Sequence, residues 1–251
     1  MTFHGVSHAY YRNGRSAHVL SNISFDVAPG ETLAVIGPSG SGKSTLLNLI
    51  VGRLKPSTGH VEVTTEQDSP PRRAFVFQAP TLLPWLTAFQ NVRLPLELEE
   101  CLDGVDTRVR EALRRVGLEK FGEYKPGQMS GGMQSRVALA RGLITRPNLL
   151  LLDEPFNDLD EATCDDMLVD LGRLISEERV TSVIVTHSLK QAAYLADHVV
   201  VLSAQNGGEI VSRHHIERRQ RDHSHLDTPE FDATVRLLRD SLRNAIRVST
   251  S

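Results

Sequence analysis

The residues with the clearest potential for chemistry form a glycine-rich stretch between a short apolar run and a helical pattern. In order they are Gly37, Pro38, Ser39, Gly40, Ser41, Gly42, Lys43, Ser44 and Thr45. The spacing matches Gly-x-x-x-x-Gly-Lys-Ser/Thr, in which glycines let successive amide N–H groups face inward while the following helix adds the positive end of its dipole. The stretch therefore predicts a loop that binds a polyphosphate, with Lys43 reaching its β- and γ-phosphates.

Two carboxylates supply a second half for such a site. The buried run Leu149–Leu152 ends in Asp153 and Glu154, and polar groups at the end of a parallel strand lie where such sheets bind ligands. We expect the Ser44 hydroxyl and, through water, Asp153 to hold Mg²⁺, which offsets the charge that develops during phosphoryl transfer. Glu154 is the candidate general base that polarises the attacking water.

The elements that must position these groups are indicated by short apolar runs and a buried helix. The helix contains Leu46–Ile50 and stops at Gly52. The expected buried, mainly parallel strands are Thr32–Ile36, Phe75–Phe77, Leu149–Leu152, Val180–Val185 and Val199–Leu202. The pattern predicts an α/β phosphate-loop core with a mainly parallel sheet.

The early segments predict an antiparallel β subdomain beside this core. They are Phe3–Ser7, Ile23–Val27 and Val61–Thr64, and Ile23, Phe25 and Val27 alternate with polar residues.

No strand pattern is evident from about residue 85 to 145, and helical spacing replaces it. Val109, Ala112, Leu113 and Val116 recur on one helical face, with Asp106 or Thr107 as the cap and Gly117 as the stop. We expect one domain over 1–251: a core at about 1–84 and 146–212, a helical subdomain at about 85–145, and a helical tail at about 213–251.

Composition narrows the function classes. The 251 residues carry a net charge of −3, which argues against the basic footprint of a nucleic-acid-binding protein. No apolar run approaches the roughly 18 residues of a spanning helix, and the N-terminus has no signal-like core.

Cys101 and Cys164 are expected to be structural thiols. A zinc site is not expected at the cluster of C-terminal histidines, because the arginines among them would repel a cation. The histidines are His214, His215, His223 and His225, and the arginines are Arg213, Arg218, Arg219 and Arg221.

Between the two halves lies Ser130-Gly131-Gly132, which opens an apparent helix. With it, the chain from about Val6 to Leu202 resembles the nucleotide-binding subunits of ATP-binding-cassette transporters. The resemblance implies an ATPase that uses ATP and Mg²⁺, and two such subunits that sandwich two ATP molecules. A pair of two copies of this chain is expected, and a pair with a different ATP-binding subunit stays open. Ser130, Gly131 and Gly132 would then contact the γ-phosphate held by the partner subunit's loop.

The resemblance also implies roles for four further residues. Tyr10 would stack on adenine, although Tyr11 is an immediate rival; Gln78 would link the metal to the helical insert and contribute to catalysis. His187 would be the switch histidine near the γ-phosphate. Asp160 matches the acidic end of a loop that communicates across the dimer.

One segment resembles a particular branch of this family. Leu82–Leu86, with Asn91 and Val92, is similar to the segment found in ATPases of nitrate, sulfonate and taurine importers. That branch implies integral membrane permease subunits, an extracytoplasmic solute-binding protein, and a location on the cytoplasmic face of the inner membrane. Trp85 would then line an apolar groove for a permease helix; the alternative is that these residues form the insert's own core.

The sequence departs from the family pattern at Met133, Ser188 and Asn157-Asp158, none of which is expected to touch phosphate or metal. Three alternatives remain at this point. An exporter or lipoprotein-release system would use a similar ATPase, and a soluble ATP clamp on nucleic acid would usually carry coiled-coil inserts or basic arms. A GTPase would need an Asn-Lys-x-Asp motif, which does not occur.

Overall fold

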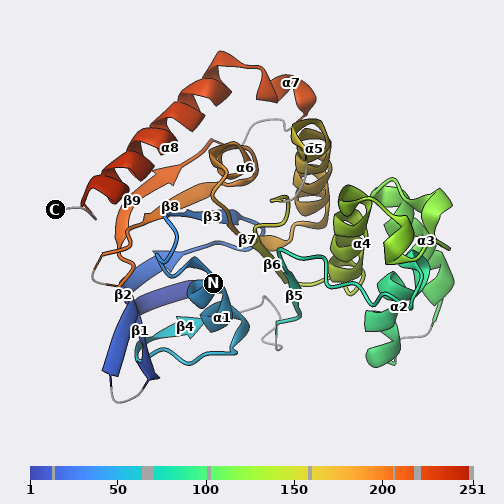
Figure 1. Ribbon diagram of the computed structural model, residues 1–251, viewed down its shortest axis with the longest axis horizontal. Helices are drawn as coiled ribbons and strands as arrows, with labels where there is room; N and C mark the ends of the chain where they lie inside the picture. The colour runs from blue at the N-terminus through green and yellow to red at the C-terminus, as the bar shows by residue number, and fades with distance from the viewer. Residues whose placement is uncertain are drawn as a thin grey trace.

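The structure is a computed structural model that describes residues 1–12, 15–63, 71–100, 103–157, 160–205, 207–217 and 222–248. Its larger sheet has the strand order β5-β6-β7-β3-β8-β9 (Figure 1). The strands are β3 (Thr32–Ile36), β5 (Arg73–Val76), β6 (Leu149–Asp153), β7 (Thr181–Val185), β8 (His198–Leu202) and β9 (Ile210–His215). All neighbouring pairs are parallel except β8 and β9, so the predicted mainly parallel sheet is confirmed.

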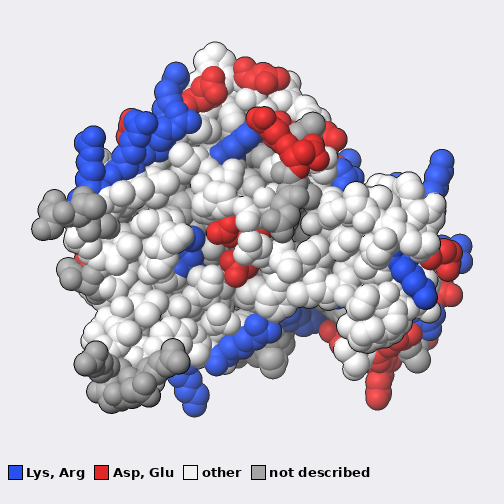
Figure 2. Space-filling model, viewed as in Figure 1, with Lys and Arg blue, Asp and Glu red and all other residues white. Residues whose placement is uncertain are grey.

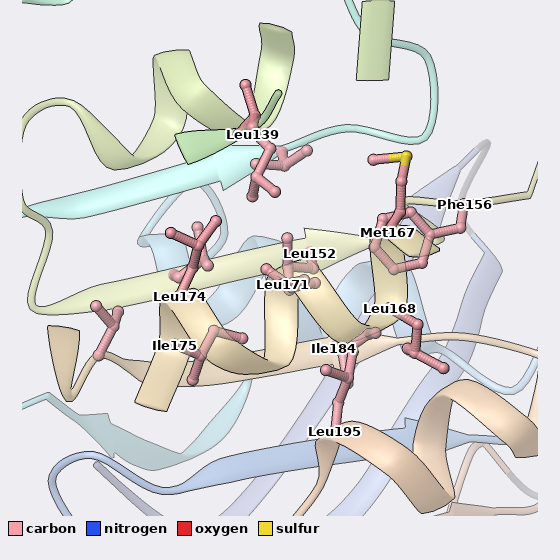
Figure 3. Packing of buried hydrophobic residues seen from close by; sticks show 14 of the residues in the cluster. Leu139, Leu152, Phe156, Met167, Leu168, Leu171, Leu174, Ile175, Ile184 and Leu195 are labelled. Carbon is pink, nitrogen blue, oxygen red and sulfur yellow. The ribbon is translucent and has the colours of Figure 1, made fainter. Parts of the chain in front are cut away.

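Both faces of this sheet are buried, which explains the continuous apolar runs of its strands. Leu150 and Leu152 pack into one core cluster, whereas Leu149 and Leu151 pack into the other. The first cluster includes residues of α5 (Glu161–Glu178), α6 (Leu189–Leu195) and α8 (Pro229–Val248), and the second includes α1 (Lys43–Val51). Figure 3 shows α5 laying Leu168 and Leu171 toward Leu152 and Ile184.

A separate three-stranded sheet covers the second cluster. Its order is β2-β1-β4, with β1 (Thr2–Arg12), β2 (Arg15–Asp26) and β4 (Thr58–Glu62), and both pairs are antiparallel. The predicted antiparallel sheet is confirmed, and β1 and β2 are longer than the apolar segments predicted. The end of the third predicted segment, Thr64, lies outside the described residues.

The helical insert contains α2 (Ala88–Leu98), α3 (Val105–Arg115) and α4 (Gly131–Leu143), which lie to one side of the sheet in Figure 1. The predicted cap of α3 is wrong: neither Asp106 nor Thr107 caps it, because the helix is entered through Gly104 at φ 62° and Asp106 lies in its first turn. A glycine reaches this left-handed conformation without a Cβ clash, so no side-chain cap marks the helix start. Gly117, at φ 71°, follows the end of α3 as predicted.

The C-terminal part differs from the expected helical tail. Residues 213–215 belong to β9, the antiparallel edge strand, and within the described residues of the tail the helices are α7 (His223–Leu226) and α8. The strand was missed because its half-buried positions are Ile210, Ser212 and His214, which do not form an apolar alternation. In the described parts of the chain, no helix combines the length and the apolar character that a membrane span requires.

Candidate nucleotide-binding and catalytic site

The glycine-rich loop leaves β3 and opens α1, the context that the motif requires. Gly42 is the N-cap of α1 at φ 89°, and a Cβ there would lie 2.6 Å from the carbonyl oxygen of Val19, so only glycine fits. The Lys43 ammonium folds back over the loop and donates to the carbonyl oxygens of Gly37 at 2.9 Å and Pro38 at 3.0 Å. Burial lowers the pKa of Lys43, and the charges of Glu154 and Asp153 act against that shift.

Asp153 is the last residue of β6 and lies beside Val185 of β7. The Ser44 side chain lies close enough to lower the pKa of this carboxyl group. Burial, followed by repulsion from Glu154, raises the pKa of Asp153, while Ser44 and Lys43 act in the opposite direction. The fold therefore brings both halves of the predicted site together. Figure 2 shows acidic side chains beside a basic one near the centre of the face, where β6 and β7 lie in Figure 1.

Glu154 and His187 meet at the same edge of the sheet. Glu154 has φ 47°, a strained conformation for a glutamate, and its backbone N–H donates to the carbonyl oxygen of Val185 at 2.8 Å. The His187 Nδ1 atom lies 2.6 Å from Glu154 Oε2. The His187 side chain is 61% exposed and that of Glu154 21% exposed, so this pair borders the site with an open side for a reactant.

Gln78 and Tyr10 flank the loop from two other strands. Gln78 follows β5, the neighbour of β6, and so lies at the carboxyl edge of the sheet near Asp153. The Tyr10 hydroxyl lies 3.3 Å from Thr45 Oγ1, whereas Tyr11 points to the opposite face of β1 and is 79% exposed. Between the two rivals, the geometry favours Tyr10 as the residue beside the loop.

Ser130 begins α4 as its N-cap, and its Oγ accepts a hydrogen bond from the backbone N–H of Met133 at 3.2 Å. Ser130 and Gly131 are exposed, and a Cβ added to Gly131 would meet no atom within 4 Å. Gly132 is buried behind them. The helix N-terminus is thus open at the surface, a place where a phosphate of another subunit could bind.

Asp160 similarly caps α5, with its carboxylate accepting from the Thr163 N–H at 3.0 Å. Two of the departures from the family pattern, Met133 and Ser188, have local structural roles. Met133 packs against the core, and Ser188 is the N-cap of α6, where its Oγ accepts from Gln191 N at 3.4 Å. Asn157 is exposed, and Asp158 lies outside the described residues.

The C-terminal histidines take part in separate contacts. His214 lies 3.0 Å from the Ser241 hydroxyl, His215 packs against His198, His223 faces Asp166, and His225 packs against Tyr194. Arg218, Arg219 and Arg221 lie outside the described residues, as does Cys101; Cys164 lies on α5 and faces α6.

Two polar residues to which the sequence analysis assigned no structural role, Asn91 and Arg141, organise the insert. Asn91 is fully buried; its Oδ1 accepts from Leu83 N at 2.8 Å and its amide nitrogen lies within 3.3 Å of three carbonyl oxygens in the preceding turn. That turn presents Trp85, which is 66% exposed, so Trp85 is not part of the insert's core. Arg141 of α4 donates to the carbonyl oxygens of Pro80 at 3.0 Å and Thr81 at 2.9 Å, and so ties α4 to the segment after Gln78.

A doubly covered parallel sheet, a phosphate loop and paired carboxylates at one edge define a phosphate-loop nucleoside triphosphatase. The family model for ABC transporters matches residues 20–157 of the chain. The chain is 38% identical to the aliphatic sulfonates import ATP-binding protein SsuB of Bacillus subtilis, over 90% of this chain and 87% of that protein. It is 40% identical to the bicarbonate transport ATP-binding protein CmpD of Synechococcus elongatus, over 85% of this chain and 80% of that protein.

Among solved structures, the chain is similar to a dimeric ATP-binding cassette, MJ0796, in a post-hydrolysis state bound to ADP and Pi. The TM-score is 0.73 and the identity 32%, covering 87% of this chain and 99% of that one. The chain belongs to the ABC transporter family, and it is an ATP-binding ATPase of that family.

Proposed function

We propose that this chain is the Mg²⁺-dependent ATPase subunit of an importer and drives uptake of a small solute, of the sulfonate, taurine, nitrate or bicarbonate kind, through a membrane permease. The observation that carries the proposal is the convergence of Lys43, Asp153, Glu154 and His187 at one sheet edge. The names of the relatives support the choice of solute class, since they include import proteins for sulfonates and nitrate.

The residues present fit a magnesium ion. Mg²⁺ prefers oxygen ligands from one or two protein side chains together with phosphates. The Ser44 hydroxyl lies on the same side of the site as the Asp153 carboxylate, whose pKa it lowers, and Gln78 can add an amide oxygen from the end of the neighbouring strand. A cation here would relieve the repulsion between Asp153 and Glu154. A Mg²⁺ ion held by these residues would offset the charge that develops in the transition state.

The protein's own groups then divide the work. The loop amides and Lys43 bind the β- and γ-phosphates, and Tyr10 stacks on the adenine. Glu154 accepts a proton from the attacking water, while His187 Nδ1, 2.6 Å away, holds its carboxylate in place. Pre-set donors and acceptors of this kind lower the barrier because they do not have to reorganise during the reaction.

Each site is completed by a second copy of the chain. The open N-terminus of α4, with Ser130, Gly131 and Gly132, supplies a further anion cradle for the partner subunit's ATP, and Asp160 lies at the same kind of open helix start on α5. In this arrangement the core at about 1–84 and 146–212 binds the nucleotide, and the helical subdomain at about 85–145 meets the permease through the turn around Trp85. A solute-binding protein delivers the solute to the permease from outside.

The test is copurification with a co-expressed candidate permease of the source organism, followed by ATPase assays of the complex in membranes. We expect ATP hydrolysis to be stimulated by a solute-loaded binding protein, with taurine, alkanesulfonates, nitrate, bicarbonate and thiamine precursors as the panel. Trp85→Ala should abolish copurification while keeping basal ATP binding, because the side chain is exposed and is not among the residues proposed to bind the nucleotide.

Leu237→Ala on α8 is the matched control, since it removes another exposed apolar side chain, 50% exposed. Failure to copurify any permease would overturn the importer role. Copurification without stimulation by any solute of the panel would overturn the solute class.

A further inference from the structure

A row of side chains, two of them buried, runs from Cys164 of α5 to the turn that carries His187. Its central member is Gln191 on α6, which is 5% exposed and follows His187 by four residues in the sequence. Buried side-chain amides are retained when their hydrogen bonds are satisfied, because leaving one unpaired costs free energy. The contacts of Gln191 therefore indicate what it holds.

Toward the site, Gln191 Oε1 accepts a hydrogen bond from the Thr186 hydroxyl at 2.8 Å. Thr186 is itself 1% exposed, and its Oγ1 accepts from the backbone N–H of Ser188 at 3.0 Å. The Thr186 backbone N–H donates at 3.3 Å to the carbonyl oxygen of Val35, which belongs to β3, the strand that leads into the phosphate loop. The residue between Thr186 and Ser188 is His187, so its backbone is fixed on both sides by these bonds.

Toward the other end, Gln191 Nε2 donates to the Cys164 sulfur of α5 at 3.7 Å. Burial raises the pKa of Cys164, so the sulfur stays a neutral thiol and a weak acceptor. Cys164 lies in the first turns of α5, whose N-cap is Asp160. The body of α5 is anchored in the core through Leu168 and Leu171, as Figure 3 shows, so it forms a firm support for Gln191.

We propose that Gln191 is a positioning residue for the ATPase reaction: its buried amide, held between Cys164 and Thr186, sets the orientation of His187 toward Glu154. Through it, the start of α5 and the catalytic pair share one hydrogen-bonded connection. The inference rests on the proposed roles of His187 and Glu154. Its consequence is that the kcat for ATP, and not the affinity for ATP, depends on Gln191.

The experiment compares the full chain with Gln191→Met, which keeps the volume but makes no hydrogen bond to Thr186. We expect kcat to fall about 5–10-fold while KM and the dissociation constant for ATP change less than about twofold, since only the positioned pair is disturbed. In a His187→Ala background, measured in single turnovers with excess protein, Gln191→Met should change the rate less than about twofold.

Lys190→Met is the matched control. Lys190 precedes Gln191 and also joins α6 to α5, with its Nζ 2.7 Å from Asp165 Oδ2, but it makes no contact with Thr186. It should leave kcat unchanged. Thr186 tests the link from its other end: Thr186→Val should reproduce the loss in Gln191→Met, and Thr186→Ser, which keeps the hydroxyl, should restore kcat.

An equal loss of rate in the wild-type and His187→Ala backgrounds would overturn the proposal, as would a loss in Lys190→Met equal to that in Gln191→Met. If Gln191→Met unfolds at the assay temperature, the comparison of Thr186→Val with Thr186→Ser tests the proposal, and equal kcat values for these two variants would overturn it. The single variants His187→Ala and Glu154→Gln are measured in parallel. A wild-type kcat in both would refute the proposed catalytic pair itself. This outcome differs from an equal loss of rate for Gln191→Met in the two backgrounds, which would refute only the role of Gln191.

Discussion

Two carboxylates, Asp153 and Glu154, are adjacent in sequence and face one site at a partly buried strand end. The raised pKa of Asp153 means that its ionised form is unfavourable in the nucleotide-free protein. Lys43 offsets part of this cost, but its own pKa is lowered by burial. The proposed binding of a cation and phosphates would relieve this cost, which lowers stability in the nucleotide-free protein.

Asp153→Asn should stabilise the nucleotide-free protein and disable it as an ATPase. Between the ordinary pKa of 3.8 and the raised folded-state pKa, the folded protein binds more protons than the unfolded chain. Stability is consequently lost as the pH rises through this window, and the loss persists at pH 7. We expect a melting temperature about 2–4 °C higher at pH 7 by calorimetry, with the gain disappearing at pH values below both pKa values.

The same variant should lose the additional stabilisation that ATP and Mg²⁺ together give to the wild type. Asp103→Asn, at an exposed turn residue, is the control and should leave both quantities unchanged. A lower melting temperature for Asp153→Asn at pH 7 would contradict the electrostatic argument.

Among the elements, the turn before α2 shows how one buried polar side chain can shape an exposed surface. Thr87 and Gln90 form a capping box at the start of α2, and Asn91 fills the space under the turn with hydrogen bonds to its backbone. The apolar residues of the segment therefore divide: Leu82 packs on the core, and Trp85 stays exposed.

Asn91→Leu should lower the free energy of unfolding by about 1–3 kcal/mol, because the Leu83 N–H and the carbonyl oxygens of the turn lose their buried partner. Permease association should weaken with it, since Trp85 loses its support, while ATP affinity is unchanged. Denaturant unfolding, permease pull-down and ATP titration measure the three quantities. Asn244→Leu, on the exposed face of α8, is the control and should change none of the three quantities. Unaltered permease association in Asn91→Leu would contradict the claim that Asn91 supports the permease-binding turn around Trp85.

At the scale of the whole molecule, one chain holds the phosphate loop and the carboxylates but presents Ser130 at an outer surface. Ser130 and Gly131 are exposed at the start of α4, whose other end is tied to the segment after Gln78 by Arg141. Figure 1 shows α4 in the insert, beside the sheet that carries the phosphate loop. If each site needs Ser130 from the partner subunit, defects in the two halves should complement each other.

Lys43→Ala and Ser130→Arg chains should each be inactive, yet an equal mixture should regain about a quarter of the wild-type ATPase activity, because half of the dimers contain one intact site of two. Mixing Lys43→Ala with Glu154→Gln is the control: both defects then lie in the loop-bearing half, and no intact site can form. Restoration in the control mixture, or none in the first, would refute shared sites. ATPase assays after mixing and dialysis provide the readout.

Local patterns were sufficient for much of the fold and the chemistry. The β6 and β7 strands could be predicted because burial on both faces demands continuous apolar runs. Lys43, Ser44, Asp153 and Glu154 could be selected because a phosphate loop and a strand end have short, specific sequence signals. The position of Gln78 and His187 after neighbouring strands follows from the same pattern, whereas their roles stay predictions.

Features that depend on long-range pairing could not be predicted in this way. Strand β9 carries polar residues at its half-buried positions, and α3 begins after a glycine, without a side-chain cap, so neither gives a clear periodic signal. Likewise the sequence around Gln191 does not distinguish it from other glutamines on helices, because its hydrogen bonds to Thr186 and Cys164 form only in the folded chain.

By itself, therefore, the sequence determined the type of sheet and the phosphate loop and selected candidates for the general base and the metal-binding groups, because those signals depend on neighbours along the chain. Only the tertiary structure decided that Ser44 lies beside Asp153, that His187 meets Glu154, that Trp85 is exposed and that Ser130 is exposed. These contacts join residues tens of positions apart, and their distances are set by how the helices pack on the sheet.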